Sequence, residues 1–343
     1  MANIRPKPHR KLRVEIRKNL TQISYFVCDN GLGHITRSVD ISKVLAKYYK
    51  IYLYSDITKL RKFSFISKIK KKEFKFNTDI NDIDINLINK IKKLNLKKNE
   101  LVISDNYPDF CIIKNPLIII ANFFWHEIFN INNINTKYIL KNLIERKVPI
   151  FGNYIFQTIQ NKKLNIKKTG FIGKFKGNLK SHKNILVSLG TAKINKKIEE
   201  KLIFQISKEL ERKNDHVKYY FDEIYFSKFK KYENVFFADY TEKMFRKISI
   251  CIGKPGMGTI NDCLKYGIVF ITLNLKFNKE FQINSQIIKK NKLGLIAQNF
   301  KSAVVKADYI FKNKIIFKKY FKLFSSLKWS GELEILNFIK KNY

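Results

Sequence analysis

Short apolar runs alternate with helical patterns along most of this chain of 343 residues. In the first half, the run "ISYFVC" at residues 23–28 has the composition of a buried strand, and apolar residues then recur at helical spacing between residues 41 and 48. Further apolar runs follow at residues 51–55, 101–105 and 116–122. Alternation of strands with helices is the pattern of a parallel sheet whose faces are covered by helices. The sequence therefore predicts an α/β fold.

A polar stretch with three glycines, residues 166–183, interrupts this alternation and has the composition of a linker between domains. A second series starts after it, with an apolar run at residues 184–190 and a helical pattern between residues 198 and 210. Further strand-like runs follow at residues 217–221, 234–239, 248–253 and 268–273. Two similar halves predict two Rossmann-like, doubly wound domains that face each other across a cleft. Ligands of such sheets bind beyond the carboxyl ends of the strands.

The predicted domain limits follow from this break. Residues 1–20 form a basic arm, residues 21–165 the first domain, residues 166–183 the linker and residues 184–343 the second domain. We expect the last helix of the chain to pack back onto the first domain. The arm contains four of the nine arginines, but no apolar stretch of the kind found in secretory signal peptides.

The net charge of +40 by itself favours a polyanionic partner. However, only nine of the 68 basic residues are arginines, whereas recognition of phosphates and bases favours the planar guanidinium group. No nucleic-acid-binding module is recognisable either. Because the lysines are spread over the whole sequence, we do not expect nucleic acid as a partner. Peripheral contact with an anionic membrane surface fits this pattern better.

The four cysteines, Cys28, Cys111, Cys251 and Cys263, are widely separated and form no CxxC pair. We expect them to be reduced residues of the core rather than disulfide partners or zinc ligands. No apolar run reaches the roughly 18 residues that a membrane-spanning helix needs. The predicted location is the cytoplasm, with peripheral contact at the inner face of the membrane.

The segment "CDNGLGHITRS", residues 28–38, lies between the first predicted strand and the first predicted helix. Gly31 and Gly33 stand where the chain must turn and where a ligand can approach the backbone. The segment matches neither the GxGxxG pattern nor a Walker loop. His34 would lie near the start of the helix, where a neutral imidazole can act as a general base, and Arg37 would hold an anionic group. A capping turn with a solvated histidine is the alternative.

A second candidate turn is "SLGTA" at residues 188–192. The hydroxyls of Ser188 and Thr191, with the backbone amides of Gly190 and Thr191, could bind a phosphate at a helix N-terminus. An ordinary turn between a strand and a helix has the same composition, so both interpretations stay open here.

The third candidate is "GKPGMGT", residues 253–259, where glycines lead from a buried strand into a helix that we expect to begin near Thr259. A glycine-rich entry to a helix suits a diphosphate. Asp262 is predicted on the first turn of that helix, where it would accept hydrogen bonds from ribose hydroxyls or would only favour the positive helix end. Three polar residues that suit a polyhydroxyl ligand follow the next strand: Glu280, Gln282 and Asn284.

Three further groups of polar residues lie in the first half. The Asp-x-Asp segment at residues 82–84 has no strand before it, so we do not expect it to bind a metal. Residues 125–127, Trp-His-Glu, follow a predicted strand and would face the cleft, with packing in the core as the alternative for Trp125. Asp105 and Asn106 also end a strand, and we expect them to hold the region of His34 in place.

Several of these segments resemble glycosyltransferase family 28, which includes the lipid-linked N-acetylglucosaminyltransferase of peptidoglycan synthesis. The second half is similar to the donor-binding domain of that family through "LVSLGT", "FADYTEKMF", "IGKPGMGTINDCLKYG" and "EFQIN". The first half is similar through "GLGHITRS" and "LVISDNYPDF". The resemblance extends over residues 20–340 in outline and implies a GT-B fold. It also implies metal-independent, inverting transfer of a sugar from a nucleotide diphosphate sugar, expected to be UDP-linked, to a hydroxyl acceptor.

The resemblance also implies roles for individual residues. His34 would be the catalytic residue, the glycine turns would bind the diphosphate, Asp262 the ribose, and Glu280 and Asn284 the sugar. The donor-binding residues it implies are Gly31, Gly33, Ser188, Gly190, Thr191, Pro255, Gly256, Met257, Gly258, Thr259, Asp262, Glu280 and Asn284. This chain departs from the family at Asp262, where glutamate is usual, and near Gln282, where the usual glutamine is displaced. The donor would be a co-substrate, with no resident cofactor and no metal.

The acceptor implied by the family is a glycan or a lipid-linked molecule of the cell envelope. Two other functions stay open. The "GxGHxxR" start also resembles the UDP-sugar hydrolase of pseudaminic acid synthesis, in which water is the acceptor. A non-catalytic protein that binds polyanions or membranes through its lysines is the second alternative.

Overall fold

The computed structural model describes residues 20–29, 32–61, 63–76, 85–98, 100–128, 134–179, 182–189, 196–212, 216–275 and 278–343. Some sequence predictions concern residues outside this set. These are residues 1–19 of the arm, Gly31, the Asp-x-Asp segment at 82–84, Gly190 and Thr191.

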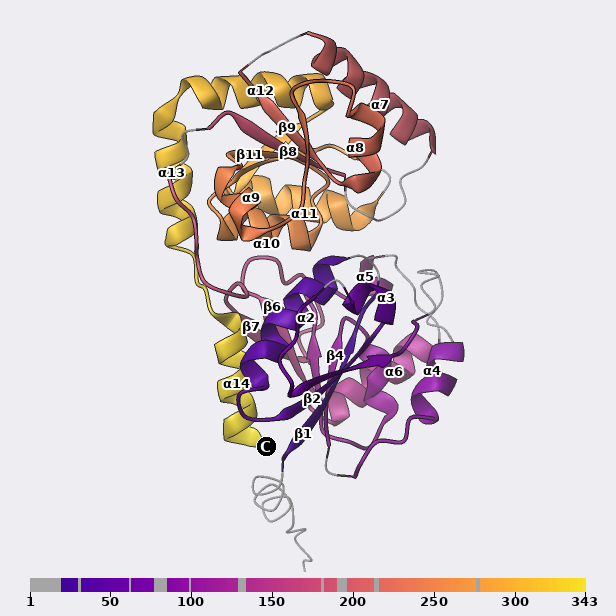
Figure 1. The fold of residues 1–343 in the computed structure, drawn as a ribbon. Coiled ribbons are helices and arrows are strands. Elements are labelled where there is room, and N and C mark those ends of the chain that lie inside the picture. Colours follow the sequence, from indigo (N-terminus) through magenta and orange to yellow (C-terminus); the bar gives the residue numbers. More distant parts are fainter. Residues whose placement is uncertain are drawn as a thin grey trace, which may run out of the picture. The chain divides into compact units, whose positions relative to one another are not determined.

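The chain forms two compact units (Figure 1). Unit 1 comprises Met1–Ile172 together with Ser330–Tyr343, and unit 2 comprises Gly173–Trp329. Each unit is an α/β domain with one parallel sheet. The α/β fold with two Rossmann-like, doubly wound domains that the sequence predicts is therefore confirmed.

Unit 1 contains a seven-stranded sheet in the order β3-β2-β1-β4-β5-β6-β7. Its strands are β1 (Gln22–Val27), β2 (Lys50–Ser55), β3 (Ile69–Glu73), β4 (Leu101–Asp105), β5 (Leu117–Ile120), β6 (Pro149–Asn153) and β7 (Asn165–Thr169). Its helices are α2 (Leu32–Leu45), α3 (Ile57–Leu60), α4 (Ile85–Lys92), the 3-10 helix η1 (Pro108–Ile112), α5 (Trp125–Ile128), α6 (Ile134–Glu145) and α14 (Gly331–Asn342).

Both faces of this sheet are buried, which explains why its central strands are continuous apolar runs. In β1, Tyr25 packs into a cluster with residues of α2 and α14, whereas the next residue, Phe26, packs into a cluster with residues of η1, α4 and α6. Figure 1 shows α14 beside α2, with α4 and α6 on the other side of the sheet. The last helix is tied to this unit by hydrogen bonds from Gly331 N to Phe171 O (2.9 Å) and from Gly170 N to Glu334 Oε1 (3.0 Å).

Unit 2 contains a six-stranded sheet in the order β10-β9-β8-β11-β12-β13. Its strands are β8 (Asn184–Ser188), β9 (Lys218–Phe221), β10 (Val235–Phe237), β11 (Ile250–Gly253), β12 (Val269–Leu273) and β13 (Gly294–Ala297). Its helices are α7 (Lys196–Glu211), α8 (Glu223–Phe229), α9 (Glu242–Lys247), α10 (Met257–Lys265), α11 (Lys279–Lys290), α12 (Phe300–Lys312) and α13 (Lys314–Ser325).

Each sheet has one point at which the strand order reverses direction. In unit 1 this switch point lies between β1 and β4, and in unit 2 it lies between β8 and β11. The connections from these strands leave toward opposite sides, so the carboxyl ends of the two central strands open a crevice. Ligands of doubly wound sheets bind in that crevice. Candidate ligand-binding residues are therefore expected close to these two switch points.

The structure corrects or extends several details of the sequence interpretation. Helix α10 begins at Met257, with Gly256 as its N-cap, rather than near Thr259, so Asp262 lies on the second turn and not on the first. The lysine-rich stretch before β4 contains α3, β3 and α4, which periodicity did not reveal. All four cysteines lie in the described part of the chain and are buried, as expected for residues of the core. Among the described residues, no helix combines the length and the apolar character needed to cross a bilayer.

Candidate active site

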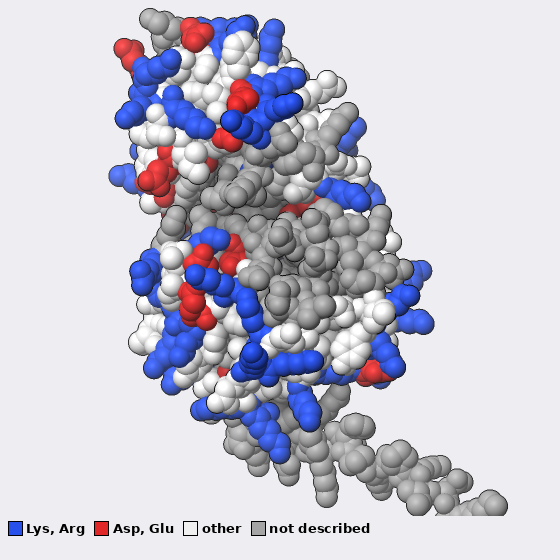
Figure 2. All heavy atoms as spheres, turned by 90° about the vertical axis from the view of Figure 1, so that its right-hand side faces the viewer, with Lys and Arg blue, Asp and Glu red and all other residues white. Residues whose placement is uncertain are grey.

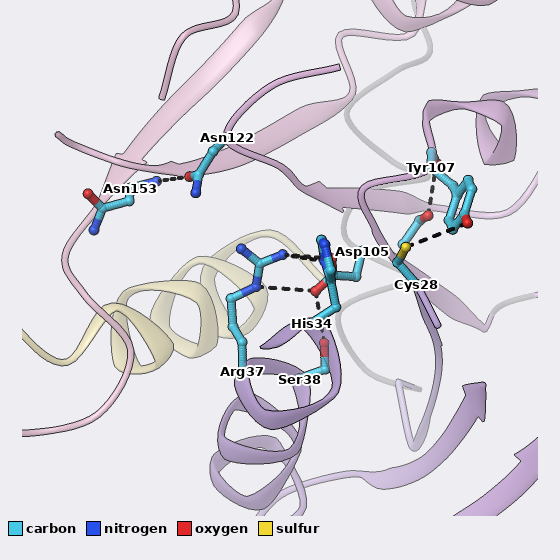
Figure 3. Close-up of polar contacts among 9 residues, drawn as sticks. Cys28, His34, Arg37, Ser38, Asp105, Tyr107, Asn122 and Asn153 are labelled. Atoms are coloured by element: carbon cyan, nitrogen blue, oxygen red, sulfur yellow. Dashed lines mark hydrogen bonds and ion pairs between the residues drawn. The ribbon is translucent and has the colours of Figure 1, made fainter. Parts of the chain in front are cut away.

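A histidine and an aspartate meet at the switch point of unit 1 (Figure 3). His34 is in the first turn of α2, which follows β1, and Asp105 is the last residue of β4. The register of these parallel strands places Val27 opposite Asp105, so the start of α2 and the end of β4 lie at the same edge of the sheet. His34 Nδ1 lies 2.6 Å from Asp105 Oδ1. The prediction that Asp105 holds the region of His34 is confirmed.

Asp105 is also held by two residues on the face of α2 that carries His34. Arg37 Nη2 donates to Oδ1 (2.6 Å) and Arg37 Nε to Oδ2 (3.2 Å), while Ser38 Oγ donates to Oδ2 (2.9 Å). Positions three and four residues apart on a helix point the same way, which is why one carboxylate can bind all three side chains. Arg37 was predicted to hold an anionic group, and in the structure that group is Asp105.

The electrostatic surroundings keep Asp105 ionised. Its side chain is fully buried, with an exposed fraction of 0%. Burial alone would raise the pKa of this carboxyl, but the charge of Arg37 and the hydrogen bonds from His34 and Arg37 outweigh burial and lower the pKa to about 2. The same carboxylate raises the pKa of Arg37 against the effect of burial. A charged aspartate must accept a hydrogen from Nδ1, so the Nε2 of a neutral His34 keeps its lone pair.

This geometry excludes the solvated capping histidine that the sequence left open. The His34 side chain is only 19% exposed and is oriented by a buried carboxylate. An imidazole held this way can take a proton through Nε2, and the aspartate then stabilises the imidazolium that forms. Chemically, such an arrangement is able to serve as a base with an orienting carboxylate.

The residues that follow β4 and β5 are mostly buried or hydrogen-bonded to one another. Asn106 has a left-handed backbone (φ 66), which asparagine tolerates better than most residues. With its amide oriented to satisfy both atoms, Asn106 donates to Phe123 O (3.0 Å) and accepts from Trp125 Nε1 (2.9 Å). His126 is buried, and desolvation lowers its pKa to about 4. Trp125, for which core packing was the alternative, is partly exposed and hydrogen-bonded to Asn106, whereas the buried residue of this segment is its neighbour His126.

In unit 2, Ser188 ends β8 and Thr259 lies in the first turn of α10. Their hydroxyl oxygens are 3.4 Å apart, so two of the predicted donor-binding residues come together at the switch point. The strands approach closely here, since a Cβ on Gly253 would lie 2.1 Å from Ser188 O. Only glycine permits this contact between the ends of β8 and β11.

The predicted diphosphate segment forms the entry to α10. Gly256 is the N-cap of α10 and has no side chain that could accept hydrogen bonds from the first-turn amides. These amides are therefore available for an anion. A Cβ at Gly256 would meet no atom within 4 Å. Pro255 is buried, whereas Gly256, Met257 and Gly258 are partly exposed.

The residues predicted to bind ribose and sugar lie on two helices of unit 2. Asp262 is half-buried on α10, and Glu280 is half-buried in the first turn of α11. Asn284 is buried, and its Nδ2 donates to Pro255 O (2.8 Å), so this side chain supports the entry to α10. Gly33 lies in the first turn of α2 in unit 1, beside His34.

One charged residue at this edge was not predicted from the sequence. Lys254 follows β11 and is buried, with an exposed fraction of 4%. Burial lowers its pKa to about 8, although Asp222 and Glu199 favour its charged form. Its position after the apolar run "ICIG" was the available signal, but a lysine in this lysine-rich sequence does not attract notice.

No group of three or more histidine, cysteine or acidic side chains that could hold a metal ion occurs within the described residues. The expectation of metal-independent chemistry stays a prediction.

No protein-family model matches the sequence, and no curated protein matches it. Solved structures do share the fold. LpCGTa in complex with UDP aligns with a TM-score of 0.63 at 10% identity, over 94% of this chain and 100% of that chain. The spinosyn rhamnosyltransferase SpnG complexed with thymidine diphosphate aligns with a TM-score of 0.62 at 8% identity, over 93% of this chain and 100% of that one. The kitacinnamycin glycosyltransferase aligns with a TM-score of 0.61 at 12% identity, over 94% of this chain and 99% of that chain.

The fold is GT-B. At these identities the comparison establishes the architecture, and the chain spans nearly the full length of the structures that it matches.

Proposed function

We propose that this protein is a glycosyltransferase that moves a sugar from a nucleotide diphosphate donor to a hydroxyl group. The observation that carries the proposal is the contact between His34 and Asp105 at the carboxyl edge of a GT-B domain, because it supplies an oriented base. The GT-B structures with bound UDP and thymidine diphosphate support a nucleotide diphosphate donor. We assign donor binding to unit 2 and the base to unit 1.

The proposed reaction is a single displacement. Nε2 of His34 accepts the proton of the acceptor hydroxyl while the acceptor oxygen bonds to the anomeric carbon of the sugar. The bond between that carbon and the diphosphate oxygen breaks, and the nucleoside diphosphate leaves with its electron pair. Attack from the opposite face inverts the anomeric configuration. Asp105 stays charged and stabilises the imidazolium during the displacement.

Donor binding is assigned to the residues that surround the switch point of unit 2. The hydroxyls of Ser188 and Thr259 and the amides at the start of α10 would bind the diphosphate, as would the predicted Gly190 and Thr191. Positive helix ends and amides stabilise charge on a leaving group. Asp262 would bind the ribose and Glu280 the sugar, while Asn284 would act by holding Pro255. The glycine entry to α10 supports the resemblance to family 28.

The test is a panel of UDP- and TDP-sugars with a mixture of glycan and lipid-linked acceptors, read by mass spectrometry of the products. We expect a glycosylated acceptor with one donor and release of its nucleoside diphosphate. The same panel without acceptor separates the hydrolase alternative: rapid, stoichiometric release of the nucleoside diphosphate and free sugar, with water in place of the acceptor hydroxyl, would support hydrolysis and contradict transfer. Binding of heparin or other polyanions without any effect of nucleotides would support a non-catalytic protein instead.

Peripheral contact with an anionic membrane is a separate part of the proposal. Figure 2 shows lysine and arginine side chains distributed over the visible face of both units, which is consistent with the net charge of +40. Such a surface is attracted to anionic lipids within about a Debye length. Sedimentation with vesicles of phosphatidylglycerol should therefore decline steeply with salt, and equal binding to neutral vesicles would contradict this attraction.

A further inference from the structure

Lys254 occupies the switch point of unit 2 through contacts of its own backbone. Its N donates to Ser188 O (3.1 Å), which links the end of β11 to the end of β8. The preceding Gly253 brings the two strands too close for any side chain at that position. Lys254 is thus fixed where the crevice of a doubly wound sheet opens.

The charge of Lys254 is unusual for this edge. The residues that directly follow the six strands are Leu189, Asp222, Ala238, Lys254, Asn274 and Gln298, and Lys254 is the basic one among them. Asp262 and Glu280 add negative charge on the neighbouring helices. A diphosphate brought to such an edge would be repelled by its carboxylates unless a cation stood among them.

Burial makes this cation costly to the folded protein. Lys254 is 4% exposed, and its ammonium lies 5.9 Å from the ring centre of Phe281 on α11. Taking an ammonium group out of water is unfavourable unless other charges or dipoles replace its hydration. Desolvation lowers the pKa of Lys254 to about 8, so the protein keeps a charge here that is close to being lost.

Among the described residues, two carboxylates, Asp222 and Glu199, favour the charged form of Lys254. Asp222 is the N-cap of α8, and its Oδ1 accepts from Tyr225 N (3.2 Å). Glu199 of α7 accepts from Tyr225 Oη and from Lys228 Nζ, both at 3.1 Å. Both carboxylates thus accept hydrogen bonds from residues of α8 and also favour the charged form of Lys254. Desolvation also raises the pKa of Asp222.

We propose that Lys254 binds the diphosphate of the donor and neutralises it as the sugar leaves. This inference rests on the proposed function. Lys254 directly follows β11 and lies two residues before the N-cap of α10, so its ammonium would add a full charge to the partial charges of the helix amides. The bound diphosphate in turn favours the ammonium form. Lys254 would thus distinguish a nucleoside diphosphate from the nucleoside alone.

The experiment compares nucleosides with nucleoside diphosphates by isothermal titration. Uridine, UDP, thymidine and TDP are titrated into the full-length protein and into Lys254→Met, Lys254→Arg and Lys247→Met. Lys247 ends α9 ahead of β11, is exposed and lies at the opposite end of that strand, so it is the matched control. We expect Lys254→Met to weaken diphosphate binding by about 10- to 100-fold, the usual size of a charge-assisted contact. Nucleoside binding should be unchanged, and the control should behave as the wild type.

The pH dependence separates binding from a structural role. As the pH rises through about 8, Lys254 loses its proton, so the affinity of the wild type for UDP should fall. Lys254→Arg stays charged up to about pH 12, so its UDP affinity should be flat over this range. Uridine affinity should not change with pH in either protein. This comparison stays informative even where the methionine variant fails to fold.

Two outcomes would overturn the inference, and they are distinguishable. The first outcome has two parts: Lys254→Met loses uridine and UDP affinity equally, or loses neither, and the UDP affinity of the wild type does not change with pH. This outcome would remove Lys254 from the diphosphate site and leave the proposed function standing. A wild-type protein that binds none of the four compounds would overturn the donor assignment itself.

Discussion

The two switch points share a topology but are stabilised in different ways. In unit 1, side chains hold one another: His34, Arg37 and Ser38 all contact the carboxylate of Asp105. In unit 2, backbone groups take part in the contacts: Lys254 N donates to Ser188 O, and Pro255 O accepts from Asn284 Nδ2. A base needs a fixed ring orientation and tautomer, which side-chain hydrogen bonds provide. A polyanion needs amides and close approach, which glycines and a helix end provide.

In the proposed transfer reaction, unit 1 would supply the base and unit 2 would bind the donor. The strand order decides where a ligand can bind in each sheet, and the residues at that place decide what can be done to it. Substitutions at the site in unit 1 should therefore alter turnover, whereas substitutions at the site in unit 2 should alter donor affinity.

The largest effect is expected for Asp105→Asn. The amide cannot stabilise the imidazolium and favours the wrong tautomer of His34, so turnover should fall about 10²- to 10⁴-fold. UDP affinity should be unchanged, because the substitution lies in the other unit. Steady-state kinetics with the identified donor and acceptor measure the first quantity, and titration measures the second. A loss of UDP affinity similar to the loss of turnover would break the division between the units.

The same substitution should also destabilise unit 1 in a pH-dependent way. The pKa of Asp105 falls from its ordinary value of 3.8 to about 2 in the folded state, so its stabilising contribution is complete above about pH 4 and is lost as the pH falls toward 2. We expect the variant to lose about 2–3 kcal/mol of the free energy of unfolding at neutral pH, with a smaller difference at about pH 2.5.

Urea denaturation at the two pH values measures this difference. Glu145→Gln is the control, because Glu145 is 61% exposed and pairs with Lys141 on the surface of the same unit. An exposed pair contributes under about 1 kcal/mol, so the control should differ little from the wild type. A pH-independent loss in Asp105→Asn would show that the carboxylate charge is not what stabilises the group.

A pair of glycine variants tests the backbone character of unit 2. Alanine at Gly253 would place Cβ 2.1 Å from Ser188 O, so it must separate the ends of β8 and β11 and should lower both stability and UDP affinity. Gly256 has an ordinary backbone (φ −72, ψ 142) and open space around its Cα, so alanine there should leave stability unchanged. If the diphosphate approaches this amide, Gly256→Ala should still weaken UDP binding by about 10-fold. Unchanged UDP affinity in Gly256→Ala would place the diphosphate elsewhere.

The smallest effect is expected for Ser188→Ala. Its hydroxyl is one of several predicted donors to the diphosphate, and one neutral hydrogen bond contributes about 0.5–1.5 kcal/mol. UDP affinity should therefore fall about 2- to 10-fold, with turnover at saturating donor nearly unchanged. A larger effect on turnover than on affinity would indicate that Ser188 acts on the leaving group rather than on binding.

The central strands could be predicted because they are buried on both faces and so form continuous apolar runs. β3 was missed because it is an edge strand with the sequence "IKKKE", whose lysines face solvent. The short helices α3 and α4 were missed in the same stretch, where lysine and asparagine hide the apolar period. The helix start at Met257 differs from the prediction because Gly258 fits within the first turn of α10.

For the site, the sequence indicated which residues end strands but not which of them meet. His34 and Asp105 were both chosen because each follows a strand. The contact between Arg37 and Asp105 depends on the pairing of β1 with β4, and these residues are 68 positions apart in the sequence. The burial of Lys254 depends likewise on helices α7, α8 and α11, so neither feature was visible before the fold was known.

The most direct test of the account is His34→Ala, assayed for sugar transfer at saturating donor beside the wild type and His182→Ala. His182 is exposed in unit 2, so its loss controls for removal of an imidazole. The account predicts that turnover of His34→Ala falls about 10²- to 10⁴-fold while UDP affinity is retained, and that His182→Ala behaves as the wild type. Turnover of His34→Ala equal to that of the wild type would contradict the account.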